Sequence, residues 1–328
     1  MYPLKFEPFL RTMVWGGDKI ARYKQIETDV PSIGESWEIS GVREHLTAVA
    51  NGPLAGKSIA DLVAKYRDAL VGGKVYAQYG DEFPLLVKFI DARADLSIQV
   101  HPNDEMALKH HGEGFRGKTE MWYVVGADPG ACLYSGLKIP VTPEEYAAKV
   151  ADGTVTDILA RYEVHPGDVF FLPAGRIHAI CSGCFVAEIQ QTSDLTYRIY
   201  DYGRLGLDGK PRQLHTELAK EAIDYTVCPD YRTSYTPALN KEIEVVSCQY
   251  FTTTIADLDK PLEKPLSDLD SFLIVMCLAG SGTLVDDEPE GESRLSVRQG
   301  ETVLIPASSR GIRFVPDGAM KILTSCIK

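Results

Sequence analysis

Short runs of apolar or alternating residues, each closed by Gly, Pro, Asn or Asp, recur along most of this 328-residue chain. Closely spaced runs of this kind predict the strands of a β-sandwich or barrel. Two of them share a longer pattern, at 167–175 and at 300–308: a Gly turn, five strand residues, Pro-Ala and a small residue. A Gly turn, a strand and a Pro turn are common in β proteins, but the matching spacing favours two related barrels.

The chain divides between about 224 and 242, where it carries two prolines and few apolar repeats. We therefore assign residues 1–235 to one barrel and residues 236–328 to another. Helical signals interrupt the first part. Ser58 opens one expected helix, and Thr142, Pro143 and Glu145 form a capping box with Pro in the first turn. Further helices are expected over Val155 to Tyr162 and after His215.

Composition and charge exclude several classes of partner. The 45% hydrophobic and 24% charged fractions are ordinary for a globular protein. A net charge of -12 argues against nucleic acid or an anionic membrane as the main partner, although a local basic pocket can still bind a small anion. No apolar run is long enough to span a bilayer. Without a recognisable signal peptide, the seven irregularly spaced Cys predict free thiols and a cytoplasmic protein.

Four nitrogen and oxygen donors are expected to converge inside the first barrel. Gln99 and His101 share one face of a strand because side chains alternate. Glu120 begins another apolar strand, and His178 follows a Pro-Ala-Gly bend. A donor set without thiolate suits Zn²⁺, Mn²⁺, Fe²⁺ or Co²⁺. A lone His in a strand is more often a core or surface residue than a metal ligand. Gln99 carries a neutral amide, so it is either a weak ligand or a group that orients a neighbouring ligand.

The spacing from Gly167 through Pro173 and Gly175 to His178 resembles the second signature motif of the cupin superfamily, in which that His binds metal. The QVH segment followed by Glu120 resembles the first motif, with Gln in place of its first His. In order along the chain, LSIQVHPND, GKTEMWYVV, FFLPAGRIHAI and SDLTYRIYDYGR together resemble the type I mannose-6-phosphate isomerases in their short bacterial form. This resemblance runs from VWGG near the N-terminus to about Arg204 and is much weaker beyond.

The resemblance implies a mainly β fold of two cupin jelly-roll barrels and one divalent metal ion, with zinc expected. It also implies an isomerase that interconverts mannose 6-phosphate and fructose 6-phosphate through an enediol. By residue, the family's ligands fall on the four donors Gln99, His101, Glu120 and His178, its essential arginine on Arg198, and its lysine before the ligand glutamate on Lys118. The local loop before that glutamate differs from the longer eukaryotic type.

Three residues are candidates for binding a hexose 6-phosphate. Lys118 and Lys88 are candidates for the phosphate or for charge near the sugar, although Lys88 equally fits the outward position of an alternating strand. Ser97 shares the face of Gln99. Since the chain has no P-loop, phosphate recognition is implied by the family alone.

Catalysis requires a fixed cation and a base. Arg198 suits charge stabilisation because it keeps its proton, although without the resemblance a surface arginine is the preferred interpretation. Candidates for the general base are Glu44, Lys118 and a metal-bound water.

Two alternatives from different classes compete with this reading. One is another metal-dependent bicupin enzyme, such as a dioxygenase or a different sugar-phosphate isomerase, and the other is a sugar-phosphate sensor without catalysis.

In the second repeat, Gly311 stands in the place of His178 and Ile274 in the place of Glu120, so metal is expected in the first barrel alone. A monomer or weak homo-oligomer is expected.

Overall fold

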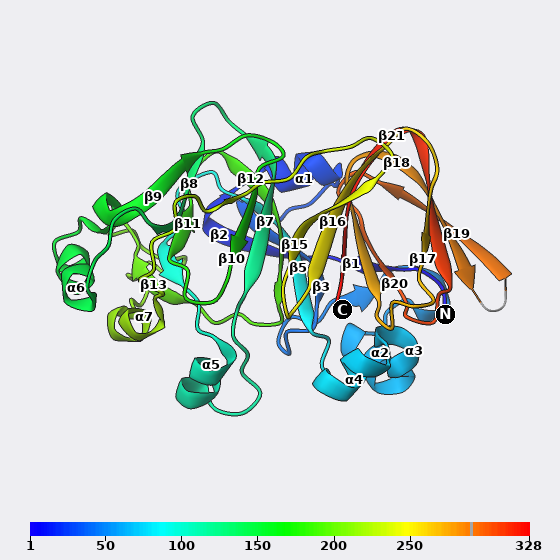
Figure 1. Cartoon of the computed structure of the whole chain (residues 1–328), viewed down its shortest axis with the longest axis horizontal. Coiled ribbons are helices and arrows are strands. Elements are labelled where there is room, and N and C mark those ends of the chain that lie inside the picture. Colours follow the sequence, from blue (N-terminus) through cyan, green and yellow to red (C-terminus); the bar gives the residue numbers. More distant parts are fainter. Residues whose placement is uncertain (289–290) are drawn as a thin grey trace.

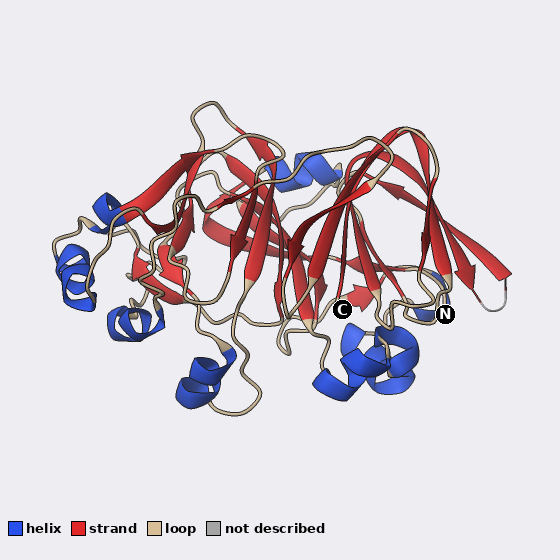
Figure 2. Cartoon of the chain, viewed as in Figure 1, coloured by secondary structure: helices blue, strands red, loops and turns tan. Residues whose placement is uncertain are grey.

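The computed structural model describes residues 1–288 and 291–328, and its strands build two neighbouring barrels (Figure 1). Within these ranges the strands form sheets of nine, seven and five strands. The few helices lie around the barrels rather than inside them (Figure 2). No helix in the described ranges has the length and apolar character needed to cross a membrane. The predicted mainly β fold with a few inserted helices is confirmed.

The first barrel consists of the seven-stranded and the five-stranded sheet. In sheet order, the seven strands are β14 (Arg232–Thr233), β10 (Val169–Leu172), β7 (Glu120–Ala127), β12 (Cys184–Gln191), β5 (Leu85–Asp91), β3 (Ile33–Ser40) and β2 (Phe9–Gly17). The five are β13 (Tyr197–Tyr200), β6 (Ile98–Val100), β11 (His178–Ile180), β8 (Cys132–Leu137) and β9 (Leu159–Glu163). Apolar residues of both sheets, among them Trp122, Phe170 and Leu133, form a shared core.

The nine-stranded sheet forms the second barrel around its own apolar core. Its main path runs β15 (Glu242–Ser247), β16 (Thr252–Leu258), β21 (Gly311–Cys326), β18 (Leu273–Glu288), β20 (Thr302–Ile305), β1 (Leu4–Glu7) and β4 (Ala48–Val49), while β17 (Leu262–Pro265) pairs with β21 and β19 (Gly291–Arg298) with β18. Two N-terminal strands thus complete a sheet made otherwise from the C-terminal part. The division between residues 235 and 236 stays a prediction.

Strand alternation explains how one strand serves two cores. In β7, Glu120 and Trp122 point into the first barrel, whereas Met121 and Tyr123 point out of it. The outward residues enter a third core that also contains Ile274, Met276 and other side chains of the nine-stranded sheet. A period of two residues therefore places chemistry on one face of the sheet and barrel-to-barrel packing on the other.

The repeat matches Glu120 with a different residue from the one predicted. Leu172 lies opposite Glu120 in the first barrel, and Ile305, which occupies the repeat position of Leu172, lies opposite Leu273 in the second. The predicted match to Ile274 is therefore wrong by one position. Counting back from the closing Gly failed because Gly126 corresponds to Ala279 and not to Gly280, as the matching one-residue bulges at Val125 in β7 and at Leu278 in β18 show. The matched residue is apolar in either case.

The helices are α1 (Lys19–Lys24), α2 (Ile59–Tyr66), α3 (Asp68–Val71), α4 (Gly73–Tyr79), α5 (Asp104–His111), α6 (Pro143–Ala151) and α7 (Thr216–Ala222), with 3₁₀ turns η1 (Gly52–Leu54) and η2 (Val155–Ile158). The expected starts at Ser58 and Thr142 are confirmed, each with a capping box, and α7 follows His215 as expected. The expected helix over Val155 to Tyr162 is wrong. Only η2 forms there, because the residues from Leu159 onward pair with β8 as strand β9.

Candidate active site

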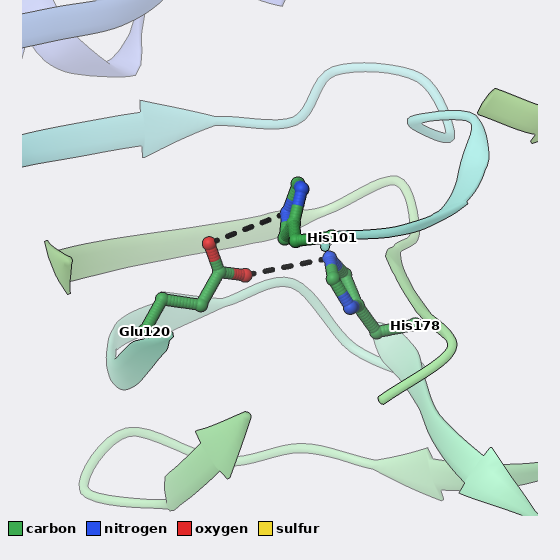
Figure 3. A group of neighbouring side chains, drawn as sticks. All are labelled: His101, Glu120 and His178. Atoms are coloured by element: carbon green, nitrogen blue, oxygen red, sulfur yellow. Dashed lines mark ion pairs between the residues drawn. The ribbon is translucent and has the colours of Figure 1, made fainter. Parts of the chain in front are cut away.

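Three of the predicted metal ligands, all buried, point toward one another (Figure 3). Gln99 on β6 lies directly opposite His178 on β11, so adjacent strands deliver both side chains. His101 follows β6 by one residue, and Glu120 is the first residue of β7 in the facing sheet. Residues distant in sequence therefore meet because two sheets close around one interior.

The distances among the three side chains match a shared ion. His101 Nε2 lies 3.5 Å from Glu120 Oε2, and His178 Nε2 lies 3.4 Å from Glu120 Oε1. Ligand atoms about 2.0–2.1 Å from one tetrahedral metal are separated by about 3.3 Å. All three residues are buried.

Hydrogen bonds direct the Nε2 lone pairs of both imidazoles toward Glu120. The Nδ1–H of His101 donates to the carbonyl of Leu195, and that of His178 to the carbonyl of Arg176, each at 2.8 Å. A carbonyl only accepts, so each neutral ring carries its proton on Nδ1 and leaves Nε2 unprotonated, able to bind a metal ion. Burial lowers the pKa of both imidazoles, to about 3 for His178. Both rings are therefore neutral, as metal ligands must be.

The carboxylate of Glu120 has few protein partners. Both of its oxygens are buried without a hydrogen bond of good geometry, although Lys118 Nζ lies 2.7 Å from Oε2. Burial, and then the charge of Glu188, raises the pKa of Glu120. A buried carboxylate facing two imidazole lone pairs is costly unless a cation is bound. The residues present therefore fit a divalent metal ion.

Gln99 lies beside this group. Its Nε2 atom is 3.2 Å from Nε2 of His178, so in this orientation the amide nitrogen faces the imidazole. The opposite orientation of the amide presents the oxygen, which is the atom a metal ligand requires. Its role as the fourth ligand stays a prediction.

A cavity of about 240 Å³ lies beside the three ligands, and all the predicted substrate-binding and catalytic residues except the base candidate Glu44 line it. Ser97, Lys88, Lys118 and Arg198 all line it, together with Gln99. Lys88 and Lys118 are buried, at 4% and 5% exposure, so the inward reading of Lys88 is the one the structure adopts. Glu44 does not line this cavity; it is exposed on a turn and lines a separate one.

A buried glutamate, which the sequence analysis missed, holds the two lysines. Lys88 Nζ lies 2.9 Å and Lys118 Nζ 3.9 Å from Glu188 Oε1, while Trp122 Nε1 donates to Oε2 at 2.7 Å. Burial raises the pKa of Glu188, but both ammonium groups outweigh it, so the net pKa lies below the ordinary value. The available signal was a carboxylate inside the apolar strand CFVAEIQ, at an inward position between Val186 and Gln190.

Arg198 projects from β13, opposite Gln99 in register. Its Nη1 donates to the carbonyl of Gln213 at 3.0 Å, and its Nε is buried without a partner. The guanidinium therefore faces the cavity with donors to spare. Other lining residues that the sequence analysis missed include Arg11, Glu35, Asp194 and Arg212.

Comparisons with known proteins identify relatives along the whole chain. The family model described as phosphomannose isomerase type I, catalytic domain, matches residues 4–121, and the mannose-6-phosphate isomerase cupin domain matches residues 241–327. A probable mannose-6-phosphate isomerase of Bacillus subtilis (strain 168) is 37% identical over 294 residues, covering 87% of this chain and 89% of that protein. The mannose-6-phosphate isomerase ManA of the same organism is 33% identical over 309 residues, 93% of each. The crystal structure of the mannose 6-phosphate isomerase from Bacillus subtilis superimposes with a TM-score of 0.86 at 30% identity, covering 99% of both chains.

Proposed function

Because the chain belongs to the type I phosphomannose isomerases, we propose that it interconverts mannose 6-phosphate and fructose 6-phosphate in the cavity beside His101, Glu120 and His178. One observation supports the assignment of the reaction to this cavity. Two neutral imidazoles and a carboxylate with few hydrogen bonds meet beside a cavity that several cations line, and the cavity is also lined by Gln99 and Lys118, which contact His178 and His101. Oxygen-rich, anionic substrates suit such a cavity, since a metal ion and fixed cations both bind oxygens.

We propose that His101, Glu120 and His178, with Gln99 as fourth ligand, hold one divalent ion. Zinc fits two imidazoles and a carboxylate without thiolate. When bound, the ion supplies Lewis-acid polarisation of the sugar oxygens. The carbonyls of Leu195 and Arg176 keep the imidazoles in the required tautomer.

The remaining side chains support an enediol route between C1 and C2. Arg198 is a permanent cation at the cavity wall, suited to stabilise the negative charge that develops on the sugar oxygens. Lys118 lies 3.1 Å from Nε2 of His101 and is held by Glu120 and Glu188, which suits an ammonium that binds a sugar oxygen or exchanges a proton. Ser97 and Lys88 line the same cavity and are suited to bind the sugar.

A coupled assay tests this function directly. Fructose 6-phosphate should form from mannose 6-phosphate in the metal-loaded protein, and formation should stop after chelation. A dioxygenase on the same fold would consume oxygen and leave the hexose phosphate unchanged. A sensor would show a raised melting temperature with mannose 6-phosphate and metal, but no product.

We further propose a cytoplasmic protein that acts as a monomer or a weak homo-oligomer.

A further inference from the structure

Arg212 enters the cavity from the segment that follows β13. Its guanidinium is held in place by a buried carboxylate. Nε donates to Asp201 Oδ2 at 2.7 Å and Nη2 to Oδ1 at 2.5 Å, while Asp201 is only 5% exposed. Such a bidentate pair of hydrogen bonds fixes the plane of the guanidinium and leaves Nη1 for another acceptor.

The surroundings of Arg212 carry more positive than negative charge. Asp201 also binds Arg204, whose Nε donates to Oδ1 at 2.8 Å, so one carboxylate is shared by two guanidinium groups. Arg198 lies nearby. Its guanidinium donates to the carbonyl of Gln213, and within the described part of the chain it has no hydrogen bond to a carboxylate. Burial, followed by the charges of Arg212 and Arg204, lowers the pKa of Arg198, with Asp201 acting in the opposite direction. Arg198 and Arg212 line the cavity, whereas Arg204 and Asp201, which form an ion pair, do not, so this wall presents a net positive charge to the cavity.

The other cations of the cavity are balanced locally. Lys88 and Lys118 lie within ion-pair distance of Glu188, and Lys118 also of Glu120. On the facing sheet, Arg11 lies 3.4 Å from a carboxylate oxygen of Glu35 and 3.6 Å from one of Asp194. Excess positive charge is therefore confined to the Arg198 and Arg212 wall, which is unusual in a chain of net charge -12.

The position of this wall relative to the metal ligands suits the far end of a hexose phosphate. In the five-stranded sheet, β11 carries His178, β6 is its neighbour, and β13 carries Arg198. Neighbouring strands are about 4.8 Å apart, so β13 lies roughly 10 Å from β11. Arg212 follows β13 in sequence and lines the same cavity. A substrate whose reacting carbons lie at the metal ligands therefore reaches this wall with its distal group.

We propose that Arg212 is the phosphate anchor of the cavity, binding the phosphate monoester dianion beyond Arg198 and so selecting phosphorylated over free hexoses. This inference rests on the proposed isomerase function. It assigns the phosphate to the Arg212 wall, and it leaves Ser97, Lys88 and Lys118 to the sugar hydroxyls nearer the metal ligands. A planar fork that already has two donors fixed on Asp201 binds phosphate oxygens with little further loss of freedom.

Steady-state kinetics on the metal-loaded enzyme test the anchor. Arg212→Ala should raise KM for mannose 6-phosphate by about 10-fold to 100-fold, the range expected for lost hydrogen bonds to a charged group, with kcat changed less than about threefold. Inhibition by inorganic phosphate should weaken by a similar factor. Arg204→Ala is the matched control, because Arg204 binds the same carboxylate but does not line the cavity; its KM and its phosphate inhibition should stay near those of the unmodified enzyme.

Calorimetric titration of the metal-loaded protein with inorganic phosphate separates this inference from the proposed function. Loss of phosphate binding in Arg212→Ala but not in Arg204→Ala supports the anchor even if no isomerase activity is found. Equal phosphate affinity in the two variants overturns it, as does a fall in kcat with unchanged phosphate inhibition, since that pattern would make Arg212 a positioning residue for Arg198. If Arg212→Ala fails to fold, Arg212→Lys replaces it, and unchanged KM and phosphate affinity there would also refute a role for the planar fork.

Discussion

At the scale of single residues, local pattern predicted the three convergent donors but not the groups that balance them. His101, Glu120 and His178 were predictable because alternation and the bend before His178 determine which face each side chain takes. Glu188 was missed because its role depends on two lysines distant in sequence, and such ion pairs appear only once β5, β7 and β12 lie side by side. Arg212 was missed for the same reason, since Asp201 and the cavity together define its role.

Arg198→Ala should lower kcat by roughly 10²-fold to 10³-fold, the typical cost of removing one donor to a developing oxyanion. The contact strengthens as negative charge forms, so kcat should fall much more than KM rises. Arg198→Lys should recover little, because an ammonium on a flexible stem does not reproduce the planar fork. Metal content should be unchanged, since Arg198 is not among the converging donors. A raised KM with nearly unchanged kcat would instead assign Arg198 to ground-state binding.

Removal of metal should abolish activity, and zinc or manganese should restore it. Elemental analysis of the reloaded protein should give about one ion per chain, because Gly311 and apolar residues replace the ligands in the second barrel. The pKa of Glu120 is raised in the metal-free protein, first by burial, so protons compete with metal for this carboxylate. Metal affinity should therefore be highest at pH values above that pKa and should decrease as the pH falls through it. Two ions per chain, or full activity after chelation, would contradict this picture.

At the scale of elements, the capping patterns predicted where helices begin, whereas the apolar pattern alone did not predict every helix correctly. The helix starts at Ser58 and Thr142 followed from side chains that bond to nearby backbone groups, an interaction that depends on local sequence alone. The segment after Ile158 was misassigned because its partner is β8, and pairing with an existing sheet edge outweighs weak helical preference. The short helix α5 was not predicted, since its residues are mostly polar and lack an apolar stripe.

The capping box of α6 offers a test at this scale. Thr142 Oγ1 accepts from the Glu145 backbone N–H at 3.1 Å, and Glu145 Oε2 accepts from the Thr142 N–H at 2.7 Å. Thr142→Ala should reduce the free energy of unfolding by about 1 kcal/mol, whereas Thr142→Ser, which keeps the acceptor, should change it little. Isomerase activity should be unaffected because α6 does not line the cavity. Denaturant titration measures both variants, and equal loss in both would show that the methyl group rather than the cap stabilises the helix.

At the scale of the whole molecule, the two barrels share structure that the division of the sequence does not show. Leu4 and Lys5 pair with Leu304 and Val303, so the N-terminal strand belongs to the second sheet. Tyr23 donates to the carbonyl of Leu278 at 2.6 Å. A change in composition marks where chain segments differ, but it carries no information on which strands pair across the boundary.

A buried ion pair lies at this junction. Lys24 Nζ is 2.7 Å from Glu38 Oε2, both side chains are nearly inaccessible, and the same ammonium donates to the carbonyl of Gly300 in the second barrel. Removing the second barrel would leave this pair without the Gly300 carbonyl that the ammonium binds. Breaking a buried pair of charges typically costs about 3–5 kcal/mol, whereas an intact pair is weak evidence for stability by itself.

We therefore expect residues 1–235, expressed alone, not to reach the native fold. This fragment lacks β20, the partner of β1, and it exposes the outward face of the seven-stranded sheet, including Val87, Phe89 and Met121, which are fully buried in the whole chain. Apolar surface of that kind leads to aggregation or dye binding. The intact chain should instead unfold in one cooperative transition, because a single core contacts both barrels. Circular dichroism and size-exclusion chromatography of fragment and intact chain measure the difference. A monomeric fragment that binds one metal ion and isomerises mannose 6-phosphate would show that the first barrel is independent and that the shared core is dispensable.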